Sequence, residues 1–145
     1  MSSESSGPHH RIGFEEIEHT ADRALKIYGR NLKELLVNAA RGLNSLMGAD
    51  DTIDAALTTK SIALDAIDAE SLLVEWLSEL VYWAEAEMLV FSKFDLHKVS
   101  ATRVDAFIHG SRATRLENHI KAVTYHNLKI TETEAGLAAT VVFDV

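Results

Sequence analysis

Two segments of the chain repeat their apolar residues at the spacing of an amphipathic helix, which brings every third or fourth side chain onto one face. The first covers residues 31–48, with Asn31 as its N-cap, Glu34 completing a capping box and Gly48 as the stop. The second starts at an Asp68 cap and continues to residue 89. Its apolar stripe includes both tryptophans, so we expect this helix to lie at the centre of the core.

The other apolar residues alternate with polar ones, which is the pattern of half-buried strands. The sequence predicts about six such strands. The residues that mark them are Ile12 and Phe14; Leu25 and Ile27; Ile62, Leu64 and Ala66; Val104, Ala106 and Ile108; Leu128 and Ile130; and Leu137, Ala139, Val141 and Phe143.

Two helices with six alternating strands indicate an α+β fold in one compact domain, with the helices packed on largely antiparallel sheets. We expect residues 1–10 to form a disordered tail, because this stretch is small, polar and contains the only proline. The folded domain is expected over residues 11–145.

The composition narrows the functional classes. A chain of 145 residues that is 47% hydrophobic can build a core without cross-links, and the absence of cysteine excludes disulfides, thiolate metal sites and a cysteine nucleophile. No apolar run has the length of a membrane helix and no signal peptide leads the chain, so we expect a soluble cytoplasmic protein.

The net charge of −8 argues against strong direct binding to nucleic acid. Residues 97–129 differ from the rest, because they carry six lysines and arginines against two acids. This segment is either ordinary solvated charge or a docking face for an acidic or phosphate-bearing partner. The basic residues are Lys98, Arg103, Arg112, Arg115, Lys121 and Lys129.

The last strand ends in two anions, the Asp144 side chain and the terminal carboxylate of Val145. The only acid of the tetrapeptide His19-Thr20-Ala21-Asp22 begins another strand near the opposite terminus. If these strands are neighbours, Asp22, Asp144 and Val145 form an oxygen-rich set suited to Ca²⁺ or Mg²⁺ rather than zinc. If they are not, Asp144 belongs to a frayed, solvated end.

A third polar group lies in the stretch IKAVTYHNLKI, where Lys121 and His126 stand among strand-forming residues. This stretch is either a strand with one wet face or a patch that contacts phosphate or an acidic partner. His19 is either a partner-contacting residue or a structural histidine.

Taken together, HTAD, KAVTYH and the closing DV, with the two helical segments between them, resemble the archease family in order and spacing from about Arg11 to Val145. One departure is Gly110-Ser111-Arg112, where family members often carry Gly-Glu. The resemblance implies an accessory protein rather than an enzyme. It implies a factor that activates the GTP-dependent tRNA-splicing RNA ligase by promoting guanylylation of its active-site histidine and multiple turnover, in tRNA splicing or RNA repair.

The resemblance also implies a metal site, usually for calcium, at Asp22, Asp144 and Val145, with Mg²⁺ or Mn²⁺ as alternative ions. His19, Lys121 and His126 are the expected partner contacts, and an RNA helicase could join the ligase. Two other functions stay open. One is a chaperone-like scaffold for RNA-modifying enzymes that uses the basic 97–129 region. The other is a metal-dependent hydrolase with His19 or His126 as its base.

Overall fold

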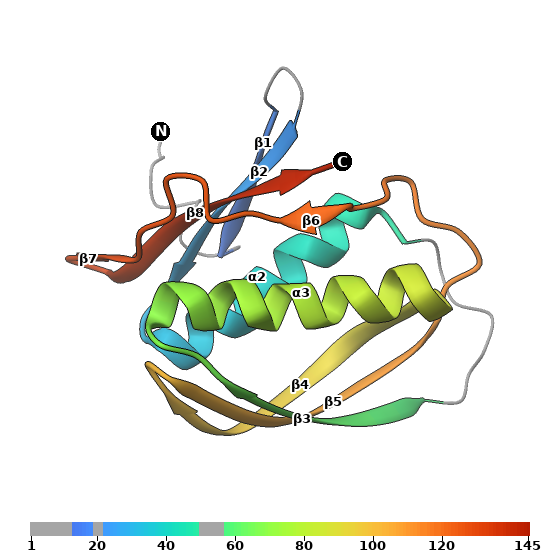
Figure 1. Cartoon of the computed structure of the whole chain (residues 1–145), viewed down its shortest axis with the longest axis horizontal. Helices are drawn as coiled ribbons and strands as arrows, with labels where there is room; N and C mark the ends of the chain where they lie inside the picture. Colours follow the sequence, from blue (N-terminus) through green and yellow to red (C-terminus); the bar gives the residue numbers. More distant parts are fainter. Residues whose placement is uncertain (1–12, 19–21, 50–56) are drawn as a thin grey trace, which may run out of the picture.

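Two antiparallel sheets enclose a layer of two helices (Figure 1). The computed structural model describes residues 13–18, 22–49 and 57–145. The expected tail, Ile12 and His19 therefore lie outside the described residues. The elements are β1 (Phe14–Glu18), β2 (Asp22–Gly29), α2 (Leu32–Met47), β3 (Thr58–Asp65), α3 (Ala69–Glu87), β4 (Leu89–Ser100), β5 (Arg103–Arg112), β6 (Ala122–Val123), β7 (Thr131–Thr133) and β8 (Gly136–Asp144).

The larger sheet has the strand order β1-β2-β8-β6, with β7 also paired to β8, and the smaller one has the order β3-β5-β4. Both helices contact strands of both sheets, so the helical layer is shared rather than placed on an outer face. The expectation of an α+β fold with two helices on antiparallel sheets is confirmed. The described residues form eight strands, two more than the six expected.

The helix ends form as the sequence predicts. The Asn31 side chain accepts the Glu34 N–H at 2.9 Å, and the Asp68 side chain accepts the Ser71 N–H at 2.8 Å, so each cap satisfies an otherwise unbonded donor. Gly48 ends α2 in the left-handed conformation, with φ of 60°. A side chain there would also collide with Glu117, so glycine suits both the backbone and the packing.

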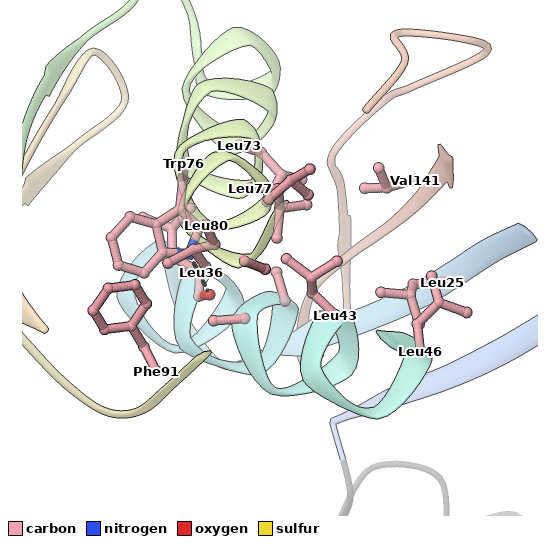
Figure 2. Packing of buried hydrophobic residues seen from close by; sticks show 14 of the residues in the cluster. Leu25, Leu36, Leu43, Leu46, Leu73, Trp76, Leu77, Leu80, Phe91 and Val141 are labelled. Carbon is pink, nitrogen blue, oxygen red and sulfur yellow. Dashed lines mark hydrogen bonds between the residues drawn. The ribbon is translucent and has the colours of Figure 1, made fainter. Parts of the chain in front are cut away.

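The core lies between the two sheets, where the helices meet. Trp76 of α3 is fully buried and donates its indole N–H to the backbone oxygen of Leu36 in α2 at 2.8 Å (Figure 2). Leu25 of β2 and Val141 of β8 close this core from the side of the larger sheet. None of the helices in the described ranges is both long enough and apolar enough to span a bilayer.

Candidate functional site

The first residue of β2 and the last residue of β8 lie directly opposite each other. β2 and β8 are antiparallel neighbours, and their register pairs Asp22 with Asp144. Residues paired in this way point to the same face of a sheet, with Cβ atoms about 4.5–5.5 Å apart. The metal site expected from the sequence requires these two strands to be neighbours, and they are. Two acids that are 122 positions apart in the chain therefore share one end of the larger sheet.

The two aspartates lie on the face of this sheet that points away from the helices. Leu25 and Val141 point into the core, so strand alternation places Asp22 and Asp144 on the other face. The next pair along that face is Ala24 with Val142, and both are buried. Oδ1 of Asp22 is buried as well, whereas Asp144 is exposed. The pair therefore adjoins a buried apolar pair on the same face and has one solvent-facing carboxylate.

The donor chemistry of this pair fits a hard divalent cation. Two like charges directly opposite each other in a sheet repel, and a cation between them would relieve the repulsion. The pair is not a complete cage, because no group of three His, Cys, Asp or Glu side chains within the described residues could hold a metal. Sites with only two carboxylates fill their remaining positions with water, a terminal carboxylate or the phosphate oxygens of a partner.

Lys121 is close to the aspartate pair through its backbone. Its N–H donates to the carbonyl of Asp144 at 2.8 Å, just before β6 pairs with the end of β8. The register places Ala122, not Lys121, on the face of Asp144. The Lys121 side chain instead helps to line a groove between β6 and α3.

His126 lies in the exposed turn that follows β6. Its backbone N–H donates to Thr124 Oγ1 at 3.2 Å, and Thr124 Oγ1 donates in turn to the carbonyl of Val142 at 2.9 Å. These bonds anchor the turn to β8 while leaving the imidazole exposed. The position of His19, the other histidine proposed as a partner contact, lies outside the described residues.

The basic residues of the 97–129 segment do not gather on one face. Lys98, Arg103 and Arg112 belong to β4 and β5 of the smaller sheet, whereas Lys121 adjoins the larger one. The Arg103 guanidinium is also engaged, since it contacts Asp65 and Asp105 at 2.8 Å each. Its hydrogen bonds lower the pKa of the Asp105 carboxyl and raise the pKa of Arg103 itself.

The segment that departs from the archease pattern also lies on the smaller sheet, at the end of β5. A Cβ at Gly110 would collide with the backbone carbonyl of Val90 in β4, so the strand pairing requires glycine there. Ser111 is buried and Arg112 is exposed. This segment and the aspartate pair therefore lie on different sheets.

One surface was missed in the sequence analysis, the groove between α3 and residues 120–123. It is lined on the α3 side by residues such as Ser78, Tyr82 and Glu85. The available signal was Tyr82, an aromatic residue that lies beside the apolar stripe of α3 instead of on it. It is 58% exposed.

Comparison with known proteins identifies a consistent set of relatives. Residues 14–145 match the model of the Archease protein family (MTH1598/TM1083). The chain is 36% identical over 140 residues to the protein archease of Methanosarcina acetivorans, covering 91% of this chain and 95% of that protein. It is 37% identical over 142 residues to that of Saccharolobus solfataricus, covering 91% of this chain and 98% of the relative.

Two solved structures have a similar fold. The solution structure of Methanobacterium thermoautotrophicum protein 1598 has a TM-score of 0.68 at 29% identity, covering 92% of this chain and 99% of the other. The crystal structure of a Thermotoga maritima archease, described as a possible chaperone, has a TM-score of 0.66 at 26% identity. It covers 90% of this chain and 96% of its own.

Proposed function

This chain belongs to the archease family, and from that premise we propose that it is a metal-binding accessory protein of the GTP-dependent tRNA-splicing RNA ligase. In this role it promotes guanylylation of the ligase's active-site histidine and allows repeated turnover in tRNA splicing or RNA repair. The observation that carries the proposal is the register of β2 and β8, which places Asp22 opposite Asp144 at the end of a sheet.

An incomplete site suits this task better than a closed one. Transfer of a nucleotide to a histidine needs metal ions and phosphates aligned with the nucleophile, and a divalent cation supplies charge neutralisation there. Asp22 and Asp144 would hold that cation on their shared face, and Val145 would add its terminal carboxylate. The coordination positions they leave open are those that a nucleotide phosphate or a ligase side chain can fill.

The same geometry supports an accessory role rather than a catalytic one. The sequence contains no cysteine, no P-loop and no dinucleotide-binding glycine motif. Asp144 is exposed at the end of β8, so this side of the pair can approach the active site of another protein. Binding there would also favour the ligase conformation that accepts the nucleotide, because a ligand shifts an equilibrium toward the state it binds more tightly.

The test is a time course of ligase guanylylation, with and without this protein. Asp22→Asn and Asp144→Asn should each abolish most of the stimulation, and so should removal of metal with a chelator. Adding back Ca²⁺, Mg²⁺ or Mn²⁺ should restore the stimulation by the unaltered chain but not by the two variants. Asp95→Asn, an exposed strand aspartate on the smaller sheet, is the matched control and should stimulate normally. Normal stimulation by both pair variants, with folded spectra, would contradict the metal-dependent mechanism.

A second candidate is a chaperone-like scaffold for RNA-modifying enzymes. It draws on the description of the Thermotoga maritima relative as a possible chaperone. Under this function Arg112→Glu and Lys121→Glu would impair partner binding, whereas the two aspartate changes would not. Measuring ligase guanylylation with these four variants separates the two functions, because only the first function predicts that Asp22→Asn and Asp144→Asn lose the stimulation.

A further inference from the structure

The groove between α3 and residues 120–123 combines three features of a peptide-binding site. It has a volume of about 550 Å³ and is open to solvent. Its wall on one side is a single stripe of α3, since Ser78, Tyr82 and Glu85 are spaced by three or four residues. Its other wall is the edge of the larger sheet, formed by β6.

The first feature is an available backbone edge. β6 is the last strand in the order β1-β2-β8-β6, and no other strand of the described residues pairs with its outer side. The N–H of Thr124 donates to Val142 in β8 at 3.0 Å. In an antiparallel ladder successive residues alternate in direction, so the N–H and C=O of Val123 point away from β8, at the outer edge of the sheet. An extended chain can form backbone hydrogen bonds at such an edge.

The second feature is the exposed aromatic side chain of Tyr82. This residue is 58% exposed and packs edge-on against Trp83, with ring centroids 5.2 Å apart. Tyrosine is enriched at protein interfaces, because it buries a large rigid surface and keeps a polar end for hydrogen bonding. In the groove it stands beside apolar lining from Val81 and Ile120, which suits an apolar side chain of the partner.

The third feature is the charge. Glu85 lines the groove but is already engaged, since its carboxylate contacts His119 Nδ1 at 3.1 Å and accepts the N–H of Ile120 at 3.4 Å. These contacts fix the segment before β6 to α3. Lys121 is exposed and is the cation of the lining, so it offers an ionic contact to an acidic side chain.

We propose that this groove binds an extended peptide segment of the ligase, added as a strand at β6. The segment would place an apolar side chain beside Tyr82 and an acidic one at Lys121. This inference rests on the proposed function for the identity of the partner. It is consistent with the aspartate pair, because Lys121 N–H bonds Asp144 O. A segment in the groove would therefore hold the ligase next to the residues that carry the metal.

The experiment compares affinity with maximal stimulation, using the full chain and the full-length ligase. Tyr82→Ala and Lys121→Glu should each weaken ligase binding by about tenfold or more, as expected for central interface residues. They should raise the concentration needed for half-maximal guanylylation by the same factor. Asp144→Asn should instead lower the maximum. Tyr125→Ala is the matched control, since Tyr125 is 53% exposed but does not line the groove, and it should bind as the unaltered chain does.

A second measurement tests strand addition itself. Hydrogen exchange of the Val123 amide should slow when the ligase is bound and should not slow in the Lys121→Glu variant. If both groove variants bind normally while Asp144→Asn loses stimulation, the groove inference is overturned and the proposed function stands. If the unaltered chain neither binds nor stimulates the ligase, both are overturned. If the groove variants lose ligase binding but the Val123 amide of the unaltered chain is not protected in the complex, the strand-addition geometry is wrong.

Discussion

Asp22 and Asp144 lie directly opposite each other on neighbouring strands. Like charges directly across a sheet destabilise it, so this pair costs folding free energy when nothing lies between the carboxylates. Local arrangements that oppose stability concentrate at functional sites, where a ligand offsets them. The pairing of the two acids is therefore informative in a way that their separate presence in the sequence is not.

This reasoning predicts that Asp144→Asn has opposite effects with and without metal. In a chelator the variant should be as stable as the unaltered chain or more stable, by up to roughly 1 kcal/mol, because one repelling charge is gone. With millimolar Ca²⁺ only the unaltered chain should gain stability, since a bound ligand raises the free energy of unfolding. Thermal unfolding in both buffers measures this, with Asp95→Asn as control. A destabilised variant in chelator would contradict the repulsion argument.

Trp76 is the largest fully buried side chain among the described residues. Trp76→Phe removes its hydrogen bond to Leu36 and leaves unfilled volume between the helices, so we expect a loss of roughly 1–3 kcal/mol in the free energy of unfolding. The matched change is Trp83→Phe, because Trp83 is only partly buried and bonds Glu79 one turn away on its own helix. Urea unfolding followed by circular dichroism checks the difference. An equal loss at Trp83 would show that the buried bond contributes little.

Among the elements, the helices could be predicted from the sequence and β4 could not. The capping residues Asn31, Asp68 and Gly48 act within a few residues of their own helix, so local sequence determines them. β4 is the longest strand of the described residues, yet two register shifts each move its buried positions by one residue. Its buried and half-buried apolar residues fall at 89, 90 and 91, then 94 and 96, then 99, so no single alternation runs through it.

The other differences among the strands concern the segment that follows β5. β6 has two residues, too few to show a period, and β7 begins just after Leu128 and Ile130, which mark the predicted fifth strand.

For the candidate site, the sequence showed which acids are present and, through strand alternation, on which face of its strand Asp144 lies. It could not supply the pairing of β2 with β8, which depends on contacts between opposite ends of the chain. The direction of the Lys121 side chain likewise depends on a long-range pairing, that of β6 with β8.

The smaller sheet is joined at one end by Arg103, which links β3 to β5 through Asp65 and lies beside Asp105. Because Arg103 lowers the pKa of Asp105, ionised Asp105 adds stability above the ordinary carboxyl pKa of about 4. This contribution disappears as the pH falls through the lowered pKa. Arg103→Gln should therefore be less stable at pH 7, and the difference should shrink in acid. Urea midpoints from pH 7 down to pH 2 measure it, and Lys93→Gln on the same face should show no such convergence.

At the scale of the whole molecule, the shared helix layer joins the two sheets into one cooperative unit. α3 is apolar over most of its circumference because it packs against strands of both sheets (Figure 1). Neither sheet can separate without exposing that helix to water. This coupling matters for the proposed function, since it gives the aspartate pair at the end of the larger sheet a rigid support.

This coupling predicts that damage to one sheet is felt equally in the other. Ile108 is fully buried in β5, the central strand of the smaller sheet, and Ile108→Val should lower the free energy of unfolding by about 0.5–1.5 kcal/mol. Native-state hydrogen exchange should show the same decrease at the slowest amides of β2 and β8 as at those of β5. Ile67→Val is the control, because Ile67 is 87% exposed and the change should have little effect. If protection falls in β5 while β2 is unchanged, the sheets open separately, and the support for the aspartate pair does not extend through the helix layer.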